Sequence, residues 1–387
     1  MLNKGTYLFS RTFGIFANSL FSMTFIWWLQ NGSHSSTLVG AAEGIFSLVA
    51  ALSIFYGSVI DYLSFKKVSI YSVAIQTIIL FLIFGTMSWF NKNYFLLIGL
   101  AVIISVSNNF FDPADRAILK DNVTSDEMTN LVSKVSIIDQ GVNIAGTLVS
   151  GLLLSVFISQ EIILFCGLIS LLGYLLLVVS LKNVSSNSKE AKKANFKYIF
   201  KGYKFIRKNS FLNFYFWSSI LYSFTTPAMV VLLPKVASDL HSNVLYSTFY
   251  ACFIIGFIIG AIVASKLKPH AKVISITWMS SAIPLFVMLF SISNWIIFSI
   301  SIFIFGILTS VHNILSESLI QIITVDTVLG RVLTTLKTST SLGGPIGSVI
   351  AGILLDHSGE AAMIAGCAVL IFLSGLNIMR TKDIAVI

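Results

Sequence analysis

Long apolar runs recur along almost the whole of this 387-residue sequence, and they constrain its fold more than any other feature. Ile75–Phe84 and Ile296–Ile304 are two examples. A helix of about 20 apolar residues is long enough to cross the hydrocarbon core of a bilayer, which is about 30 Å thick. The repetition of such runs therefore predicts an all-α protein that crosses a membrane many times.

The composition excludes a water-soluble fold of this size. Hydrophobic residues make up 56% of the chain and charged residues 11%, with a mean hydropathy of +0.89, whereas soluble domains are about 25% charged. The net charge of +9 sits in short loops between apolar runs, which argues against nucleic acid as a partner. Cys166, Cys252 and Cys367 all lie inside apolar runs, so neither a disulfide framework nor a metal or cofactor site is expected.

Hydropathy divides the chain into twelve predicted spans. The first is read as a retained helix, because no small-residue cleavage site follows it. The spans lie near residues 7–29, 38–60, 68–90, 94–112, 135–157, 162–181, 211–233, 244–265, 272–291, 295–315, 338–356 and 361–379.

The distribution of Lys and Arg gives the orientation. With both termini placed inside the cell, 23 of the 25 basic residues fall on the inner side, and only Lys92 and Lys235 fall on the outer side. The positive-inside rule predicts such an asymmetry, and a missed span would scramble it. We therefore expect a multi-pass protein of the cell membrane with an even number of spans and both termini in the cytoplasm.

A basic linker separates two sets of six spans. We predict an N-terminal bundle over residues 1–182, a cytoplasmic linker over 183–210 and a C-terminal bundle over 211–387. Within the linker, Phe196–Lys208 carries apolar residues at helical spacing with Lys between them. This pattern indicates an amphipathic interfacial helix with anionic lipid headgroups as its partner. The alternative is a flexible basic linker.

The two halves show a faint internal repeat. Gly146 and Gly151 have counterparts in Gly347 and Gly352, both at an offset of 201 residues. Parallel repeats of this kind occur in secondary transporters. The same glycines would let their helices approach neighbours closely.

The loop after the second span reads GSVIDYLSFKK and resembles motif A of the major facilitator superfamily. Tyr62 and Ser64 depart from the usual Arg and Gly of that motif. The residues that match are Gly57, Asp61, Lys66 and Lys67.

Three further segments resemble the macrolide-efflux (Mef-like) branch of that superfamily. Asn108–Asn130 is similar to its Phe-x-Pro-Ala loop. Glu317–Val332 and Gly343–Asp356 are similar to its second-half signature, in which a Gly-Arg-Val precedes a helix rich in Pro and Gly. The resemblance implies the major facilitator fold and a two-bundle antiporter with alternating access, driven by protons and acting as a monomer. No Walker-type phosphate loop is present, and we do not expect an enzyme.

Two groups of residues are candidates for a conformational gate. Asp61, with Gly57, Lys66 and Lys67, can hold a neighbouring helix N-terminus in one state and release it in another. Arg331 is the second candidate, from its place in the Gly-Arg-Val segment. The alternatives are a solvated loop acid and basic residues that only fix the topology.

Embedded ionisable residues are the candidates for binding a proton or a cationic substrate, because charge inside a membrane is costly. They are Glu43, Asp139 and, as a second pair, His312 and Glu317. The alternatives are that Glu43 reaches the outer interface, that Asp139 pairs with Lys134, and that His312 is structural.

Polar and aromatic residues of spans one and seven are candidates for a substrate cavity. They are Asn18, Phe21, Phe25, Trp217, Tyr222 and Phe224. Asn18 stands where relatives carry Asp, and span four lacks the Arg of the superfamily's motif B. The alternative is that the aromatic rings face lipid or only pack.

The sequence leaves three functions open. The first is export of a bulky amphipathic small molecule of the macrolide type. The second is export of an endogenous metabolite, siderophore or peptide. The third is a membrane sensor or immunity component that transports nothing.

Overall fold

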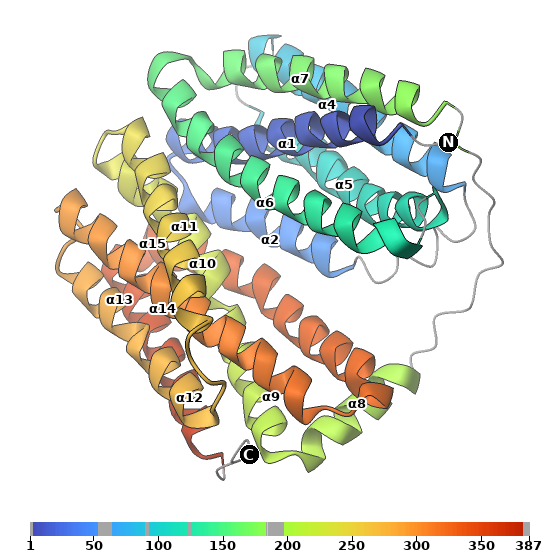
Figure 1. Cartoon of the computed structure of the whole chain (residues 1–387). Helices are drawn as coiled ribbons and strands as arrows, with labels where there is room; N and C mark the ends of the chain where they lie inside the picture. The colour runs from blue at the N-terminus through green and yellow to red at the C-terminus, as the bar shows by residue number, and fades with distance from the viewer. Residues whose placement is uncertain are drawn as a thin grey trace. The chain divides into compact units, whose positions relative to one another are not determined.

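The computed structural model describes residues 3–52, 64–89, 93–122, 125–182, 184 and 197–381. Within these ranges the chain is helical and contains no strand (Figure 1). The all-α membrane fold that the hydropathy predicts is therefore confirmed. Gly57 and Asp61 lie outside the described residues.

Fourteen helices are described. Their bounds are α1 Lys4–Ser33, α2 Ser36–Ala51, α4 Phe65–Trp89, α5 Tyr94–Asn122, α6 Ser125–Val156, α7 Ser159–Ser180, α8 Lys197–Lys208, α9 Ser210–Ser223, α10 Thr225–Asp239, α11 Asn243–Ala264, α12 Ala271–Ser280, α13 Ala282–Leu289, α14 Trp295–Ile323 and α15 Asp326–Met379. Nine helical stretches of the described chain are long and apolar enough to cross a membrane, and α2 is a shorter apolar helix. The last two predicted spans share α15, where Gly359, at a φ of 80°, separates them.

The chain forms two compact units. The first comprises Met1–Ser33 and Val49–Ala194, and the second comprises His34–Leu48 and Asn195–Ile387. Most of α2 thus packs with helices from the second half of the sequence. The division at residues 182 and 211 remains a prediction.

In the first unit, α1 packs against α6 and α7, and α4 packs against α5 and α7. Tyr7, Phe65, Ala114 and Leu177, from four different helices, belong to one buried hydrophobic cluster. This cluster anchors the start of α1 beside the later part of α5.

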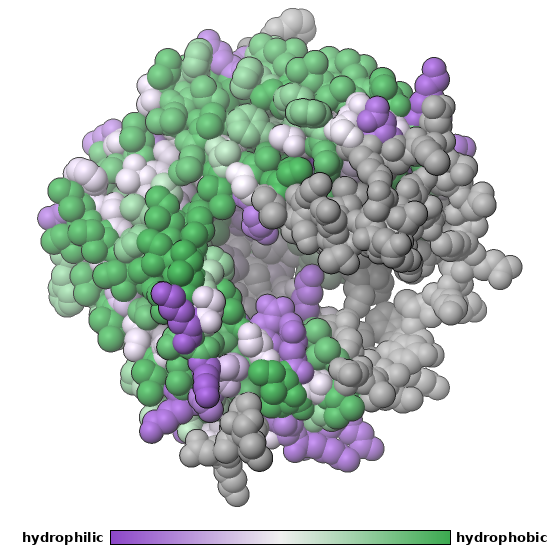
Figure 2. All heavy atoms as spheres, in the orientation of Figure 1, coloured by the Kyte–Doolittle hydropathy of each residue, from purple (hydrophilic) through white to green (hydrophobic). Residues whose placement is uncertain are grey.

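Apolar side chains also cover outward surfaces of this unit. Leu168, Leu172, Leu175 and Val179 are exposed on α7 at spacings of three or four residues, which places them on one helix face. Figure 2 shows hydrophobic atoms gathered over α7 and α4. In a membrane protein, such a face contacts lipid.

Two predicted spans of the second unit are broken, each three residues before a proline. Phe224 separates α9 from α10 ahead of Pro227, and Ser281 separates α12 from α13 ahead of Pro284. Proline removes a helical N–H donor, and its ring clashes with the carbonyl four residues earlier. Each break therefore lies about one turn upstream of its proline.

Glycine residues allow the backbones of α11 and α14 to pack at a very short distance from each other. A Cβ added to Gly256 would lie 2.1 Å from the carbonyl oxygen of Phe303, and one added to Gly260 would lie 2.3 Å from that of Ile307. From the other side, a Cβ on Gly306 would lie 2.4 Å from the carbonyl oxygen of Phe253. Only residues without a Cβ permit this backbone contact.

Helix α2 packs against α15 in a similar way, and Asp356 caps its N-terminus. A Cβ on Gly40 would lie 2.3 Å from the carbonyl oxygen of Ser348. The carboxylate of Asp356 accepts hydrogen bonds from the backbone N–H groups of Ser36 and Thr37, each at 2.8 Å, and from the Ser35 hydroxyl at 3.0 Å. A carboxylate at this end of a helix also meets the positive end of its dipole.

Replacing Asp356 with Ala is expected to destabilise the protein by about 1–2 kcal/mol, because the first turn of α2 loses its cap. Thermal unfolding of the purified protein in detergent measures the loss. Asp356→Asn keeps an oxygen acceptor and should lose less. An Asp356→Ala protein as stable as wild type would contradict the capping role.

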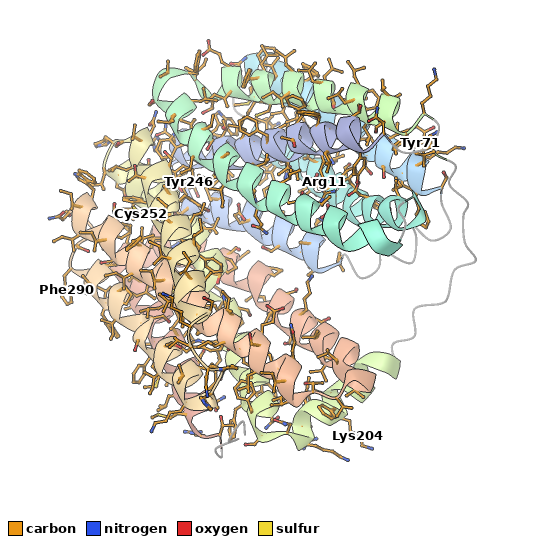
Figure 3. All side chains as sticks on the ribbon, in the orientation of Figure 1. Arg11, Tyr71, Lys204, Tyr246, Cys252 and Phe290 are labelled. Carbon is orange, nitrogen blue, oxygen red and sulfur yellow. The ribbon has the colours of Figure 1, made fainter. Side chains whose placement is uncertain are left out.

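The linker segment contains a helix, α8, which packs against α9 and α15. Ile206 is fully buried, and the ring of Tyr203 lies 5.5 Å from that of Phe216. Lys204, Arg207 and Lys208 are exposed, and Figure 3 marks Lys204. The apolar face of this helix thus rests at least partly on protein, while its basic face is open.

Candidate functional site

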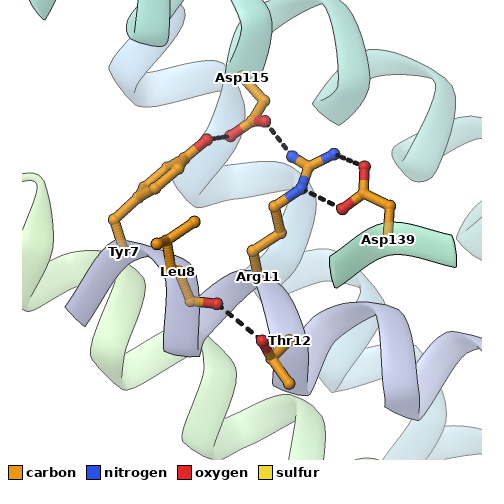
Figure 4. A network of polar contacts seen from close by, with 6 residues as sticks. All are labelled: Tyr7, Leu8, Arg11, Thr12, Asp115 and Asp139. Atoms are coloured by element: carbon orange, nitrogen blue, oxygen red, sulfur yellow. Dashed lines mark hydrogen bonds and ion pairs between the residues drawn. The ribbon is translucent and has the colours of Figure 1, made fainter. Parts of the chain in front are cut away.

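Four side chains of the first unit form a polar network between α1, α5 and α6 (Figure 4). Arg11 donates from Nε to Oδ1 of Asp139 and from Nη2 to Oδ2, each at 2.6 Å. Its Nη1 donates to Asp115, whose other carboxylate oxygen accepts the Tyr7 hydroxyl. One guanidinium therefore joins two carboxylates from different helices.

Local sequence explains this arrangement. Tyr7 and Arg11 are four residues apart on α1, so they lie on one face of the helix. Both oxygens of Asp115 and both oxygens of Asp139 accept hydrogen bonds within the network. A paired, bidentate geometry of this kind is the strongest available to Arg and a carboxylate.

Burial differs sharply among the three charged groups. The Asp115 side chain is 1% exposed, the Arg11 side chain 10% and the Asp139 side chain 29%. Asp115 lies beyond Asp112, where the apolar stretch of α5 ends. Its burial raises the pKa of Asp115 to about 6, against the opposing effects of Arg11 and Tyr7. This carboxyl can therefore change its protonation state near neutral pH.

A proton on Asp115 must disturb the network. Both of its oxygens already face donors, the Tyr7 hydroxyl and an Arg11 N–H. A protonated carboxyl carries a donor of its own and one less acceptor site. Protonation would therefore either reverse the hydrogen bond with Tyr7, whose hydroxyl can also accept, or displace Arg11, which can only donate. In both cases it would remove one of the two charges that hold the guanidinium.

A polar pocket of about 270 Å³ adjoins the network within the same unit. Arg11 and Asp139 line it, together with side-chain amides from four helices. These amides belong to Asn18, Gln76, Asn108, Gln140 and Asn143. The Asn108 amide donates to Asn18 at 2.8 Å. The pocket can bind a group that both donates and accepts hydrogen bonds.

The second unit contains a smaller apolar pocket of about 60 Å³. Tyr222, Tyr250, Phe253 and Phe305 line it, with Thr309 among its polar residues. The hydroxyl of Tyr222 donates to that of Thr309 at 3.3 Å. This pocket suits a hydrocarbon or aromatic group.

The predicted coupling residues fall into both units. Asp139 pairs with Arg11, a partner that the sequence reasoning did not name, and the side chain of Lys134 lies outside the described residues. Glu43 lies on α2 near two tyrosines of α11. His312 is fully buried, whereas Glu317 is exposed, so these two do not form a buried pair.

His312 lies among aromatic rings. Its ring stacks on Trp278 at 4.5 Å and meets the edge of Tyr222 at 5.1 Å. Neither ring nitrogen has a hydrogen-bond partner among the described residues. This setting accords with the structural alternative as well as with a functional role.

The gate candidates are described only in part. The Lys66 ammonium donates to the carbonyls of Lys182 and Val184, at 3.1 and 3.2 Å, just beyond the C-terminal end of α7. Lys67 is exposed. Arg331 lies in α15, and its side chain is outside the described residues.

The cavity candidates separate into three groups. Asn18 lines the polar pocket, and Tyr222 lines the apolar one. Phe21 and Phe25 are buried and stack on each other at 5.4 Å, away from the residues that line either pocket. The remaining two are Trp217, which is half exposed, and Phe224, which lies at the helix break.

Three residues of the network were missed from the sequence, namely Tyr7, Arg11 and Asp115. Arg11 lies inside the first predicted span and is one of the 23 basic residues counted on the inner side. A cation within an apolar span is itself a sign of function. Asp115 belongs to the Pro-Ala segment, but the burial of its side chain depends on how the helices pack and could not be predicted from the sequence.

The sequence also matches a family model. The description of that model is Major Facilitator Superfamily, and it matches residues 7–272 and again 228–383. The chain belongs to the major facilitator superfamily. Among curated proteins, no sequence matches this chain significantly.

Solved structures agree on the fold. A point mutant of the nucleoside transporter NupG superposes with a TM-score of 0.76 at 12% identity, covering 98% of this chain and 99% of its own. A bacterial homologue of the iron transporter ferroportin, in an inward-facing state, gives 0.76 at 12% identity, covering 97% and 98%. A bacterial homologue of the lysosomal transporter Spinster gives 0.71 at 12% identity, covering 98% and 96%. This protein is therefore a multi-pass membrane transporter of that superfamily.

Proposed function

We propose that this transporter exports an amphipathic small molecule of the macrolide type and that entry of protons drives the export. The single observation that carries the proposal is the Arg11 network. It joins two carboxylates to one guanidinium beside a pocket. Such a group can bind a proton or stay ionised, and the two states differ in the contacts of α1.

The coupling would work through the charges that hold Arg11. With both carboxylates ionised, Arg11 ties α1 to α5 and to α6. A proton on Asp115 weakens the tie to α5, and a proton on Asp139 weakens the tie to α6. Substrate binding in the adjoining pocket and proton binding to the network then compete for the same arrangement of Arg11. Competition of this kind is what exchange of substrate for proton requires.

The two units contain pockets of opposite chemistry, and each pocket by itself suits one kind of surface of an amphipathic substrate. The first unit offers amides, an Arg and carboxylates, whereas the second offers rings and aliphatic side chains. An amphipathic molecule carries both kinds of surface. The sequence resemblance to the macrolide-efflux branch supports the same substrate class.

The proposal includes a location and a gate. The distribution of basic residues supports a location in the cell membrane with both termini in the cytoplasm, and the exposed basic face of α8 would contact anionic lipid headgroups. The motif A residues Gly57, Asp61, Lys66 and Lys67, together with Arg331, would stabilise one state of the cycle. We propose a monomer as the working unit.

Flux through the wild-type protein in proteoliposomes tests this function. Radiolabelled erythromycin is the probe, and a pH gradient is imposed across the vesicle membrane. We expect the gradient to accelerate flux several-fold and an ionophore that collapses the gradient to abolish the acceleration. A flux rate that does not change with the pH gradient would contradict proton drive. The absence of any flux would favour a protein that transports nothing.

A further inference from the structure

Glu43 is a carboxylate without a charge partner in the part of the chain that the structure describes. It lies on α2, in the portion that belongs to the second unit. The ion pairs of the described residues involve Arg11 or Lys235, and none includes Glu43. A carboxylate in an apolar span costs about 2.5–3.5 kcal/mol to insert. Asp139 has Arg11 to offset this cost, and Glu43 has no comparable partner there.

Aromatic hydroxyls lie close to this carboxylate. Glu43 lies within electrostatic range of Tyr246 and Tyr250, which are one turn apart on α11. Their rings meet edge to face at 5.4 Å, and Tyr246 is 1% exposed. Figure 3 labels Tyr246. Gly40 and Gly44 contact α15, and successive helical residues differ by about 100° in direction. Glu43 thus points away from the line of Gly40 and Gly44, and its electrostatic interaction is with the tyrosines of α11.

Tyr250 connects the carboxylate to the apolar pocket. It lies in electrostatic range of Glu43 and also lines the pocket with Tyr222, Phe253 and Phe305. One side chain therefore borders both a negative charge and a hydrocarbon-lined space. The pocket, at about 60 Å³, has room for one apolar group of a ligand and not for a bulky ligand as a whole.

We propose that Glu43, Tyr246 and Tyr250, with the apolar pocket beside them, bind the cationic amine end of a lipophilic substrate. Aromatic faces attract organic cations, and a countercharge stabilises an ionised carboxylate in an apolar span. A neutral ligand would leave that charge unbalanced, and an anionic ligand would be repelled by it. The ligand class is therefore a protonated or quaternary amine, or a comparable organic cation, that carries an apolar group. This inference rests on the proposed export function for its role in transport.

Equilibrium binding to the full-length protein in detergent tests the inference without any gradient. The probes are tritiated tetraphenylphosphonium, a lipophilic cation, and triphenylphosphine oxide, an uncharged compound of related shape. Wild type should prefer the cation. Glu43→Gln should weaken binding of the cation about ten-fold or more and leave binding of the neutral probe unchanged. Glu43→Asp should retain part of the preference.

Glu360→Gln is the matched control, because it removes a carboxylate of the same unit whose ion-pair partner is Lys235. It should bind both probes as wild type does. A wild-type protein without preference for the cation, or a Glu43→Gln variant that keeps the preference, would overturn the inference. Equal weakening of both probes would also overturn it, since that result indicates lost packing. Failure of gradient-driven flux would contradict the proposed function and leave this binding result unaffected.

Discussion

Replacing Arg11 with Met is expected to destabilise the first unit by about 3–5 kcal/mol. The substitution leaves Asp115, which is 1% exposed, and Asp139 without their shared countercharge. Two uncompensated carboxylates close together also repel each other, so at least one must take up a proton. Thermal unfolding in detergent, followed at several pH values, measures the effect. The loss should be largest at high pH, where Asp115 most readily gives up its proton, and smaller at pH 5.

Removing one carboxylate together with the Arg should restore much of this stability. The double variant Arg11→Met/Asp115→Asn deletes the most buried charge along with its partner, so its penalty should fall well below that of Arg11→Met alone. Lys66→Met is the matched control, because it also removes a positive charge of the first unit, but the hydrogen bonds of Lys66 go to backbone carbonyls and not to carboxylates. A single Arg11→Met protein that unfolds as wild type does would contradict the charge balance of the network.

Replacing Gly256 with Ala is expected to destabilise the second unit by about 2–3 kcal/mol, against the usual gain of about 1 kcal/mol for Gly to Ala within a helix. The added methyl carbon would lie 2.1 Å from the Phe303 carbonyl oxygen and 3.0 Å from its carbon. Backbone cannot yield as a flexible side chain can, so α11 and α14 must separate. Thermal unfolding of the purified variant checks the sign of the change.

Gly366→Ala provides the control for that experiment. Gly366 is also helical and belongs to the same unit, but a Cβ there would meet nothing within 4 Å. Its substitution should be neutral or stabilising. If Gly256→Ala proved as stable as Gly366→Ala, that result would contradict the close backbone contact between α11 and α14.

Most of the fold follows from the sequence, because the bilayer imposes strong requirements on length and polarity. Twelve apolar stretches correspond to the described helices, once the linker helix α8 is set aside, the two broken spans are each counted as one and α15 is counted as two. The positions of the helix breaks at Phe224 and Ser281 were harder to predict from the sequence. Proline indicates a disturbance, but the position of the break depends on the carbonyl one turn earlier.

The candidate site was less predictable, because it depends on which helix faces meet. Asp139 was identified as an embedded charge, but its partner is 128 residues earlier in the sequence, and no local pattern links the two. Lys134, five residues before Asp139, was the obvious partner from the sequence alone. Asp115 was hidden for a related reason, since its burial arises from the packing of α1 on the later part of α5.

Glycine residues predicted close helix contacts at some positions but not at others. The sequence indicated close helix contacts at Gly146 and Gly347, and both face other helices at short range. A Cβ on Gly146 would lie 2.8 Å from Cβ of Ser19, and one on Gly347 would lie 2.6 Å from the carbonyl oxygen of Phe224. Gly141 has open space around it. A glycine inside a span thus permits close contact, and only the facing residue decides whether the contact exists.

Proton coupling through the Arg11 network is the central claim, and it is tested most directly by comparing accumulation with exchange in proteoliposomes. Asp115→Asn and Asp139→Asn are assayed for gradient-driven accumulation of labelled erythromycin and for its exchange against unlabelled compound without a gradient. Glu161→Gln, an exposed carboxylate of α7, serves as the control. If the network couples protons to substrate, both Asn variants will exchange substrate but no longer accumulate it, whereas the control will do both. Asn variants that still accumulate erythromycin as wild type does would contradict this coupling.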